Sequence, residues 1–280
     1  MSWKDGVNQA LRRTVGYELH RAAGGRGGAA APPLGGGYRA RLVPEPVFVL
    51  TSVRSGSTLL RLLLDSHSEI RAPHEMHLRR LRVEIERPFA ALAVETAGLS
   101  VPELEHLLWD RLLHRELARS GKRVVVDKTP SNVLIWKRLS RAWPKARFVF
   151  LLRHPAAIAD SWQRAHPKQD EATVDAAVLR YMEAIEAARA VLPGHTVRYE
   201  ELTVDPAQVL QGLCGFLGVG YEPTMLDYGA VDREPLKRGI GDWSAKIRSG
   251  TVQPPAPLPS VDQVRPSLVG VARTWGYAGD

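Results

Sequence analysis

The sequence predicts an α/β fold of three layers, in which helices cover both faces of a central parallel sheet. The first observation is that short apolar runs alternate with longer segments of helical periodicity. Strands that alternate with helices are joined by crossover connections, which make neighbouring strands parallel. The second is that a buried strand, a Gly-containing turn and the start of a helix follow one another within 46–75. This succession creates an anion site, because the first N–H groups of a helix have no backbone partner.

The first strand is expected at 47–50, an apolar run with Pro44 and Pro46 before it. Leucines dominate 58–66, so the helix expected there is largely buried. Further strands are expected at 122–127, 147–152 and 195–199, and further helices at 101–119, 131–143, 156–164, 173–191 and 206–217.

Two regions are less regular. Residues 79–117 are expected to be mostly helical, with Pro88 and Pro102 dividing the helix and Ser100 capping its second part. From residue 221 onward Pro and Gly are frequent and little periodicity is visible. This last region is expected to wrap the edge of the sheet rather than to form a domain.

The chain is expected to contain one domain, 41–280, preceded by an amphipathic segment at 1–21 and a flexible Gly/Pro-rich linker at 22–40. For 1–21, packing on its own domain or on a second copy, which would give a homodimer, is favoured over contact with a membrane surface. No apolar run is long enough to span a bilayer and no signal peptide is visible, so a cytoplasmic protein without integral membrane association is expected.

Composition restricts the kinds of partner. The formal net charge of +8 favours anionic ligands. Nucleic acid is not expected, because the cations lie at strand ends instead of alternating with aromatic residues along one face. Cys214 is the only cysteine, which excludes an internal disulfide and a cysteine-based metal site. It is expected to be a core residue of the helix at 206–217.

Ligands of parallel sheets bind beyond the carboxyl ends of the strands. Four segments follow the expected strands, and three of them bring a cation to the same edge. These segments are Arg54, Asp127-Lys128-Thr129, Arg153 and Tyr199-Glu200. The sequence therefore predicts a shared anion site at this edge.

The turn 53–58 is not a Walker A loop, because it lacks the second glycine and the lysine before the hydroxyl residue. The motif RSGST followed by LLRLLLDSH instead resembles the 5′-phosphosulfate loop of sulfotransferases that use 3′-phosphoadenosine 5′-phosphosulfate (PAPS). This resemblance implies a P-loop-like sulfotransferase fold. It also implies that the donor, and its product 3′-phosphoadenosine 5′-phosphate (PAP), bind to Arg54, Ser55, Gly56, Ser57 and Thr58.

Later motifs extend the resemblance to about 46–248. The segment RFVFLLRHPAAIADSW is similar to the family's 3′-phosphate segment, which implies that Arg153 and Ser161 hold that phosphate. KRGIGDW is similar to the RKGxxGDW region of cytosolic members, with one residue fewer between the glycines, and implies Lys237, Arg238 and Gly239 as further donor contacts. The segment YEEL, which begins at Tyr199, is similar to a strand end of the family that lies near the adenine. This similarity implies that Tyr199 lies near the adenine.

The resemblance also implies the residues at the reacting centre. Glu75 lies 21 residues after Arg54, as does the catalytic carboxylate of protein-tyrosine sulfotransferases, and it is assigned as general base. His74 and His77 are rival bases, because cytosolic members use a histidine. Lys128 is expected to neutralise the transferred group together with Arg54. No metal is expected, and the histidines lack the HExxH spacing of a zinc site.

The sequence does not choose the acceptor, which is expected to be a hydroxyl group of a small molecule, lipid or carbohydrate. An intracellular metabolite, such as a natural product of secondary metabolism, is favoured over an exported protein. Two alternatives stay open: a P-loop nucleotide kinase or phosphotransferase, and a non-catalytic binder of nucleotides or polyanions.

Overall fold

The computed structural model describes residues 41–230, 245–254, 257–260 and 263–277. All of these belong to one compact unit, Gly36–Asp280. The amphipathic segment expected at 1–21 and the linker expected at 22–40 lie outside the described residues. No helix among the described residues is both long enough and apolar enough to cross a membrane.

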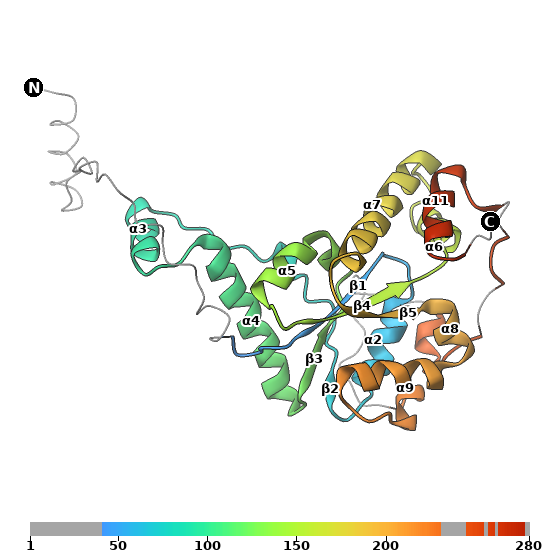
Figure 1. Ribbon diagram of the computed structural model, residues 1–280, viewed down its shortest axis with the longest axis horizontal. Coiled ribbons are helices and arrows are strands. Elements are labelled where there is room, and N and C mark those ends of the chain that lie inside the picture. Colours follow the sequence, from blue (N-terminus) through green and yellow to red (C-terminus); the bar gives the residue numbers. More distant parts are fainter. Residues whose placement is uncertain (1–40, 231–244, 255–256, 261–262, 278–280) are drawn as a thin grey trace, which may run out of the picture. The chain divides into compact units, whose positions relative to one another are not determined.

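A five-stranded sheet forms the centre of the described part of the chain, with the strand order β2-β3-β1-β4-β5 (Figure 1). Every neighbouring pair in it is parallel. The strands are β1 (Val47–Thr51), β2 (Ile70–Arg71), β3 (Val124–Asp127), β4 (Arg147–Leu152) and β5 (Gly194–Arg198). The parallel α/β fold predicted from the sequence is thereby confirmed.

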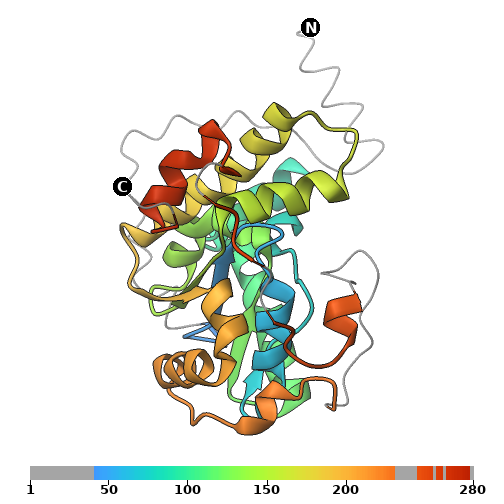
Figure 2. The same ribbon diagram turned by 90° about the vertical axis from the view of Figure 1, so that its right-hand side faces the viewer.

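Helices cover both faces of this sheet (Figures 1 and 2). The α-helices are α2 (Ser57–Asp65), α3 (Pro88–Thr96), α4 (Val101–Ser120), α5 (Trp136–Ala142), α6 (Pro155–Ala165), α7 (Glu171–Arg189), α8 (Tyr199–Val204), α9 (Pro206–Leu217), α10 (Ala245–Arg248) and α11 (Pro266–Thr274). Three short 3₁₀ helices are η1 (Leu78–Arg80), η2 (Pro130–Ile135) and η3 (Pro223–Leu226).

The central strand β1 divides the interior into two cores. Val47 and Val49 point to the face covered by α2, α8 and α9, whereas Phe48 and Leu50 point to the face covered by α4, α5, α6, α7 and α11. All five residues of β1 are buried, because side chains alternate between two covered faces. Burial of each large apolar side chain contributes about 1.5–3 kcal/mol. Cys214 is buried in the first of these cores, as expected.

The structure differs from the expected elements in four places. Strand β2 was not predicted, because its two residues are too short to show a pattern. Residues 131–143 divide into η2 and α5, and Tyr199 begins α8 instead of ending a strand. Helix α11 lies in the region expected to be irregular; it buries Leu268 and Ala272 and packs against α6 and α7.

Candidate functional site

The turn between β1 and α2 has a left-handed backbone at two positions. Arg54 has φ 62°, and Gly56, the N-cap of α2, has φ 78°. A β-carbon at position 56 would lie 2.2 Å from ring atoms of Tyr199. Position 56 therefore requires glycine both for its backbone angle and for the approach of Tyr199. The start of α2 beyond it carries the positive end of the helix dipole.

Arg153 follows β4 and lies beside this turn. Its Nη1 donates to the carbonyl oxygen of Arg54 at 2.8 Å, and its guanidinium carbon lies 4.5 Å from the centre of the Tyr199 ring. Burial lowers the pKa of Arg153, and the charges of Arg54 and Arg164 lower it further, although Tyr199 and Glu200 raise it. A crowded, partly desolvated guanidinium is stabilised when an anion binds to it.

Helix α6 brings two further side chains to Arg54. The Nε of Arg54 donates to Ser161 Oγ at 3.0 Å, and Ser161 is buried. Arg164, one turn later on α6, lines the same pocket. Arg54, Arg153 and Arg164 thus bring three cations to one pocket, together with the hydroxyl of Ser161, and this combination suits a phosphate group.

Glu200 fixes the start of α8, where Tyr199 lies. Its Oε1 accepts from the backbone N–H of His154 at 2.9 Å, and its Oε2 accepts from the hydroxyl of Tyr277 at 2.6 Å. Because His154 follows Arg153 in the chain, this carboxylate connects the two segments that carry Arg153 and Tyr199. Glu200 does not line the pocket, so the stacking of Arg153 on the Tyr199 ring is stabilised from outside it.

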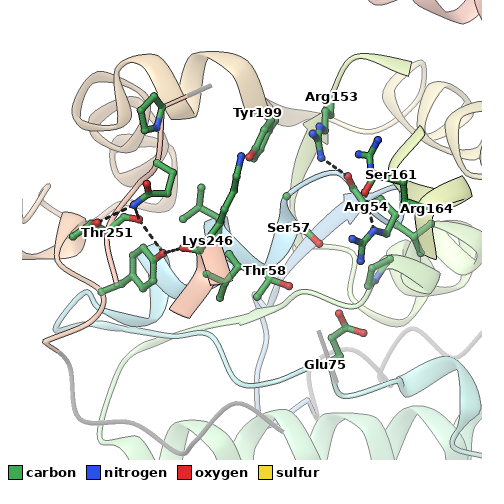
Figure 3. Close-up of a pocket in the computed structure, with 18 residues that line it drawn as sticks. Arg54, Ser57, Thr58, Glu75, Arg153, Ser161, Arg164, Tyr199, Lys246 and Thr251 are labelled. Atoms are coloured by element: carbon green, nitrogen blue, oxygen red, sulfur yellow. Dashed lines mark hydrogen bonds between the residues drawn. The ribbon is translucent and has the colours of Figure 1, made fainter. Parts of the chain in front are cut away.

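These elements surround a pocket of about 420 Å³ (Figure 3). Eight residues predicted from the sequence line it: Arg54, Gly56, Ser57, Thr58, Glu75, Arg153, Ser161 and Tyr199. In Figure 3 Arg54, Arg153, Ser161 and Arg164 are grouped on the right, Lys246 and Thr251 lie on the left, and Glu75 lies below. Side chains that follow β1 and β4, and side chains of α2, α6 and α8, thus converge where the parallel strands end, as predicted.

Glu75 follows β2 and is held from two sides. Its Oε1 forms an ion pair with Lys128 Nζ, and its Oε2 lies 3.5 Å from His77 Nε2. The Lys128 side chain is only 1% exposed, and burial lowers its pKa while the charge of Glu75 opposes that effect. His74 is exposed, and its Nδ1 lies 3.2 Å from the backbone oxygen of Glu75.

Some predicted site residues do not line the pocket. Ser55 is buried, and its hydroxyl has no hydrogen-bond partner within the described part of the chain. Lys128 contacts Glu75 but is not among the lining residues. Lys237, Arg238 and Gly239 lie outside the described residues.

The pocket also contains side chains that the sequence did not indicate, namely Arg164, Tyr228, Lys246, Thr251 and Gln253. Arg164 could have been found, because it lies three residues after Ser161 on an expected helix and such residues share a face. The other four belong to the region without periodicity, where no pattern signals which side chains return to the sheet. Within the described residues, no group of three or more His, Cys, Asp or Glu side chains could hold a metal ion.

Comparison with known proteins agrees with this arrangement. A model of the sulfotransferase family matches residues 46–223, which is more than half of the chain. The chain belongs to the sulfotransferase family. The match contains the β1–α2 turn, Glu75, Arg153 and Ser161, so the family predicted from the RSGST and RFVFLLRHP motifs is confirmed.

Two curated relatives give the range of similarity. Nodulation protein NoeE of Sinorhizobium fredii is 29% identical over 231 residues, which cover 70% of this chain and 55% of the relative. Protein-tyrosine sulfotransferase 2 of Gallus gallus is 24% identical over 212 residues, which cover 68% of this chain and 55% of the relative. The chain therefore spans about half the length of these curated relatives.

Solved structures show the same fold. The sulfotransferase domain from the curacin biosynthetic pathway has a TM-score of 0.62 at 23% identity, covering 85% of this chain and 99% of that domain. The sulfotransferase domain of the Synechococcus PCC 7002 olefin synthase has a TM-score of 0.60 at 22% identity, covering 84% and 96% respectively. Both likenesses support the P-loop-like sulfotransferase fold.

Proposed function

We propose that this protein transfers a sulfuryl group from PAPS to a hydroxyl group of a small-molecule, lipid or carbohydrate acceptor, with Glu75 as general base. The observation that carries the proposal is the convergence in one pocket of the α2 N-terminus, a cluster of arginines and the Glu75 carboxylate. Such a pocket combines a place for a strongly anionic donor with a group that can accept a proton.

The residues of the pocket fit the two charged ends of PAPS, which supplies the sulfuryl group for transfer. Arg153, Ser161 and Arg164 form the part suited to the 3′-phosphate, because several donors converge there. The start of α2 at Ser57 and Thr58 suits the 5′-phosphosulfate. Arg54 lies between the two groups, since its turn leads into α2 and its side chain contacts Ser161. Lys237, Arg238 and Gly239 remain predicted contacts to the 3′-phosphate.

Tyr199 is assigned to the adenine. Its ring lies between Gly56 and the guanidinium of Arg153, so it is fixed by contacts on two sides. A fixed aromatic side chain beside a phosphate site provides an apolar surface for a flat base. This assignment also accounts for the requirement for glycine at position 56.

Glu75 is assigned to the proton of the acceptor. As the acceptor oxygen approaches sulfur in line with the leaving phosphate, the Glu75 carboxylate removes the hydroxyl proton. Lys128 orients this carboxylate, because its side chain is buried against Oε1. The structure thus favours a role for Lys128 through Glu75 over direct contact with the transferred group. Arg54 and the α2 dipole stabilise the negative charge at the donor.

The alternatives have less support. A P-loop kinase would use a loop lysine and a magnesium-binding hydroxyl beside it, and the turn 53–58 has neither. A non-catalytic polyanion binder would not require a carboxylate in the anion pocket, because the charge of Glu75 repels an anion.

Binding of the donor product separates these functions. PAP should raise the melting temperature of the full chain to the same extent with and without magnesium, whereas ATP should have little effect. Arg153→Ala should abolish most of the PAP shift, and Arg189→Ala, which changes a half-buried pair on α7, should not. Equal shifts with ATP and PAP, or a dependence on magnesium, would contradict the proposal. Labelled PAPS and a panel of hydroxyl compounds would then identify the acceptor.

A further inference from the structure

We infer that Thr129 and Asp127 are positioning residues for Glu75: they fix the backbone that follows Glu75, while Lys128 between them fixes its carboxylate. This inference rests on the proposed role of Glu75 as general base. Each of the three consecutive residues at the end of β3, Asp127-Lys128-Thr129, then has a role in positioning Glu75. Neither Asp127 nor Thr129 lines the pocket.

The hydroxyl of Thr129 makes three hydrogen bonds. It accepts from the backbone N–H groups of Met76 at 3.1 Å and His77 at 3.2 Å, and it donates to Asp127 Oδ1 at 2.9 Å. A hydroxyl has one proton and two lone pairs, so these contacts use its full capacity. The two N–H groups belong to the residues directly after Glu75, so Thr129 determines where the backbone leaves Glu75.

Asp127 determines how the Thr129 hydroxyl is oriented. Its side chain is fully buried, and Asn132 Nδ2 donates to its second oxygen, Oδ2, at 2.7 Å. With one oxygen bound to Asn132, the other accepts the Thr129 proton, which leaves the lone pairs of Thr129 directed toward Met76 and His77. Burial raises the pKa of Asp127, although the bonds from Asn132 and Thr129 lower it. These buried hydrogen bonds favour one arrangement of the Asp127 and Thr129 side chains, although Asn132 Oδ1 has no partner among the described residues.

The backbone that this network holds is not in a relaxed conformation. His77 has φ 50°, a left-handed angle that is unfavourable for a residue with a β-carbon. Such an angle persists where surrounding contacts determine it, and the Thr129 bond to the His77 N–H is one of these contacts. In addition, His77 Nε2 lies 3.5 Å from Glu75 Oε2, so the turn also sets the surroundings of the second carboxylate oxygen.

Thr129→Val tests the inference, because it keeps the shape of the side chain and removes all three hydrogen bonds. The readout is the rate at which labelled sulfate leaves PAPS, with water or a hydroxyl compound from the acceptor panel as acceptor. We expect kcat to fall about tenfold, because loss of geometry at a general base removes part of its contribution. PAP affinity should change by less than about twofold, because the donor contacts are elsewhere. Thr129→Ser retains the hydroxyl and should restore kcat.

A double-mutant cycle distinguishes positioning from general loss of structure. In a Glu75→Gln background Thr129→Val should have almost no further effect on kcat, because two residues that act through one group are not additive. Thr173→Val is the matched control, since it removes a Thr–Asp hydroxyl bond of 3.0 Å at the start of α7, and its kcat should equal that of the wild type. An equal loss of kcat from Thr129→Val in both backgrounds would overturn the inference.

A second variant covers the case in which Thr129→Val does not fold. Asn132→Ala frees one oxygen of Asp127 without touching the segment at 75–77, and it should lower kcat a few-fold while PAP affinity is retained. Unchanged kcat in both Asn132→Ala and Thr129→Ala would overturn the inference. Failure of the proposed function would look different, because the wild-type protein itself would then neither bind PAP nor release sulfate from PAPS.

Discussion

The side chain of Arg54 donates from Nε to the hydroxyl of Ser161 at 3.0 Å, although 107 residues separate them. Because Ser161 accepts this bond, its own proton remains able to donate to a ligand. The two residues were predicted for opposite ends of the donor, Arg54 for the 5′-phosphosulfate and Ser161 for the 3′-phosphate. Under the proposed assignment, their contact means that the two parts of the site adjoin and that one arginine acts on both.

Arg164→Ala should weaken PAP binding about five- to tenfold, because a charge-assisted hydrogen bond is worth about 1.5–3 kcal/mol when buried and less at an exposed side chain. The loss should be smaller at high salt, since ions screen an exposed arginine. Calorimetric titration with PAP at two salt concentrations measures both effects. Arg180→Ala, an exposed arginine on α7, is the control. Equal affinities for wild type and Arg164→Ala would exclude this arginine from the phosphate site.

Gly56→Ala should destabilise the protein and also abolish most PAP binding. The left-handed angle alone costs about 1–2 kcal/mol for a residue with a β-carbon. The new methyl group would also meet the Tyr199 ring at 2.2 Å and displace it. Gly98→Ala provides the control, because Gly98 has φ 73° and nothing lies within 4 Å of its β-carbon position.

Urea unfolding and PAP titration separate the two contributions. Both alanine variants should lose similar free energy of unfolding from the backbone angle, and only Gly56→Ala should lose more than this and bind PAP poorly. If Gly56→Ala binds PAP like the wild type, Tyr199 does not need its observed position to hold the donor.

Glu75→Gln should lower kcat for sulfuryl transfer about 10²–10⁴-fold, which is the usual contribution of a general base. PAP affinity should be retained or increase, because a negative charge leaves the anion pocket. His77→Ala should have a smaller effect and His74→Ala almost none, because the His74 ring is exposed. Steady-state rates and PAP titrations of the three variants test this order. A larger loss in His77→Ala than in Glu75→Gln would reassign the base to His77.

His154→Phe should make stability less sensitive to acid. The His154 side chain is 1% exposed, neither ring nitrogen has a partner within the described residues, and burial lowers its pKa. A lowered pKa in the folded state means that the neutral ring stabilises the fold above its ordinary pKa of about 6.5, and that this stability is lost as the pH falls further. Each proton that the unfolded state binds in excess of the folded state lowers the free energy of unfolding by up to about 1.4 kcal/mol per pH unit as the pH falls.

Urea midpoints at pH 7.5 and 5.5, values chosen on either side of roughly 6.5, measure the acid effect. The wild type should lose more stability than His154→Phe between the two. Part of the loss should remain in the variant, because burial also lowers the pKa of His106 and His195. His166→Phe is the control, because the His166 ring is exposed to water. Identical slopes for wild type and His154→Phe would show that the pKa of this ring is the same in the folded and the unfolded state.

The sequence predicted the parts of the site that depend on strand ends. Arg54 and Arg153 follow apolar runs whose composition identifies them as buried strands, and parallel strands end at one edge. It did not predict β2 or α11. A strand of two residues has no visible period, and α11 follows a segment rich in proline. Their formation depends on contacts with β3 and with α6 and α7, which lie far away in the chain.

The sequence by itself determined the parallel α/β fold, the sulfotransferase family and eight residues of the pocket, because strand patterning and short motifs are local properties. Only the tertiary structure decided how these residues are paired. Lys128 is buried against Glu75, Arg54 contacts Ser161, and Thr129 holds the backbone beyond Glu75. Each of these contacts joins residues more than fifty positions apart, so each depends on how the strands are ordered in the sheet and not on any local pattern.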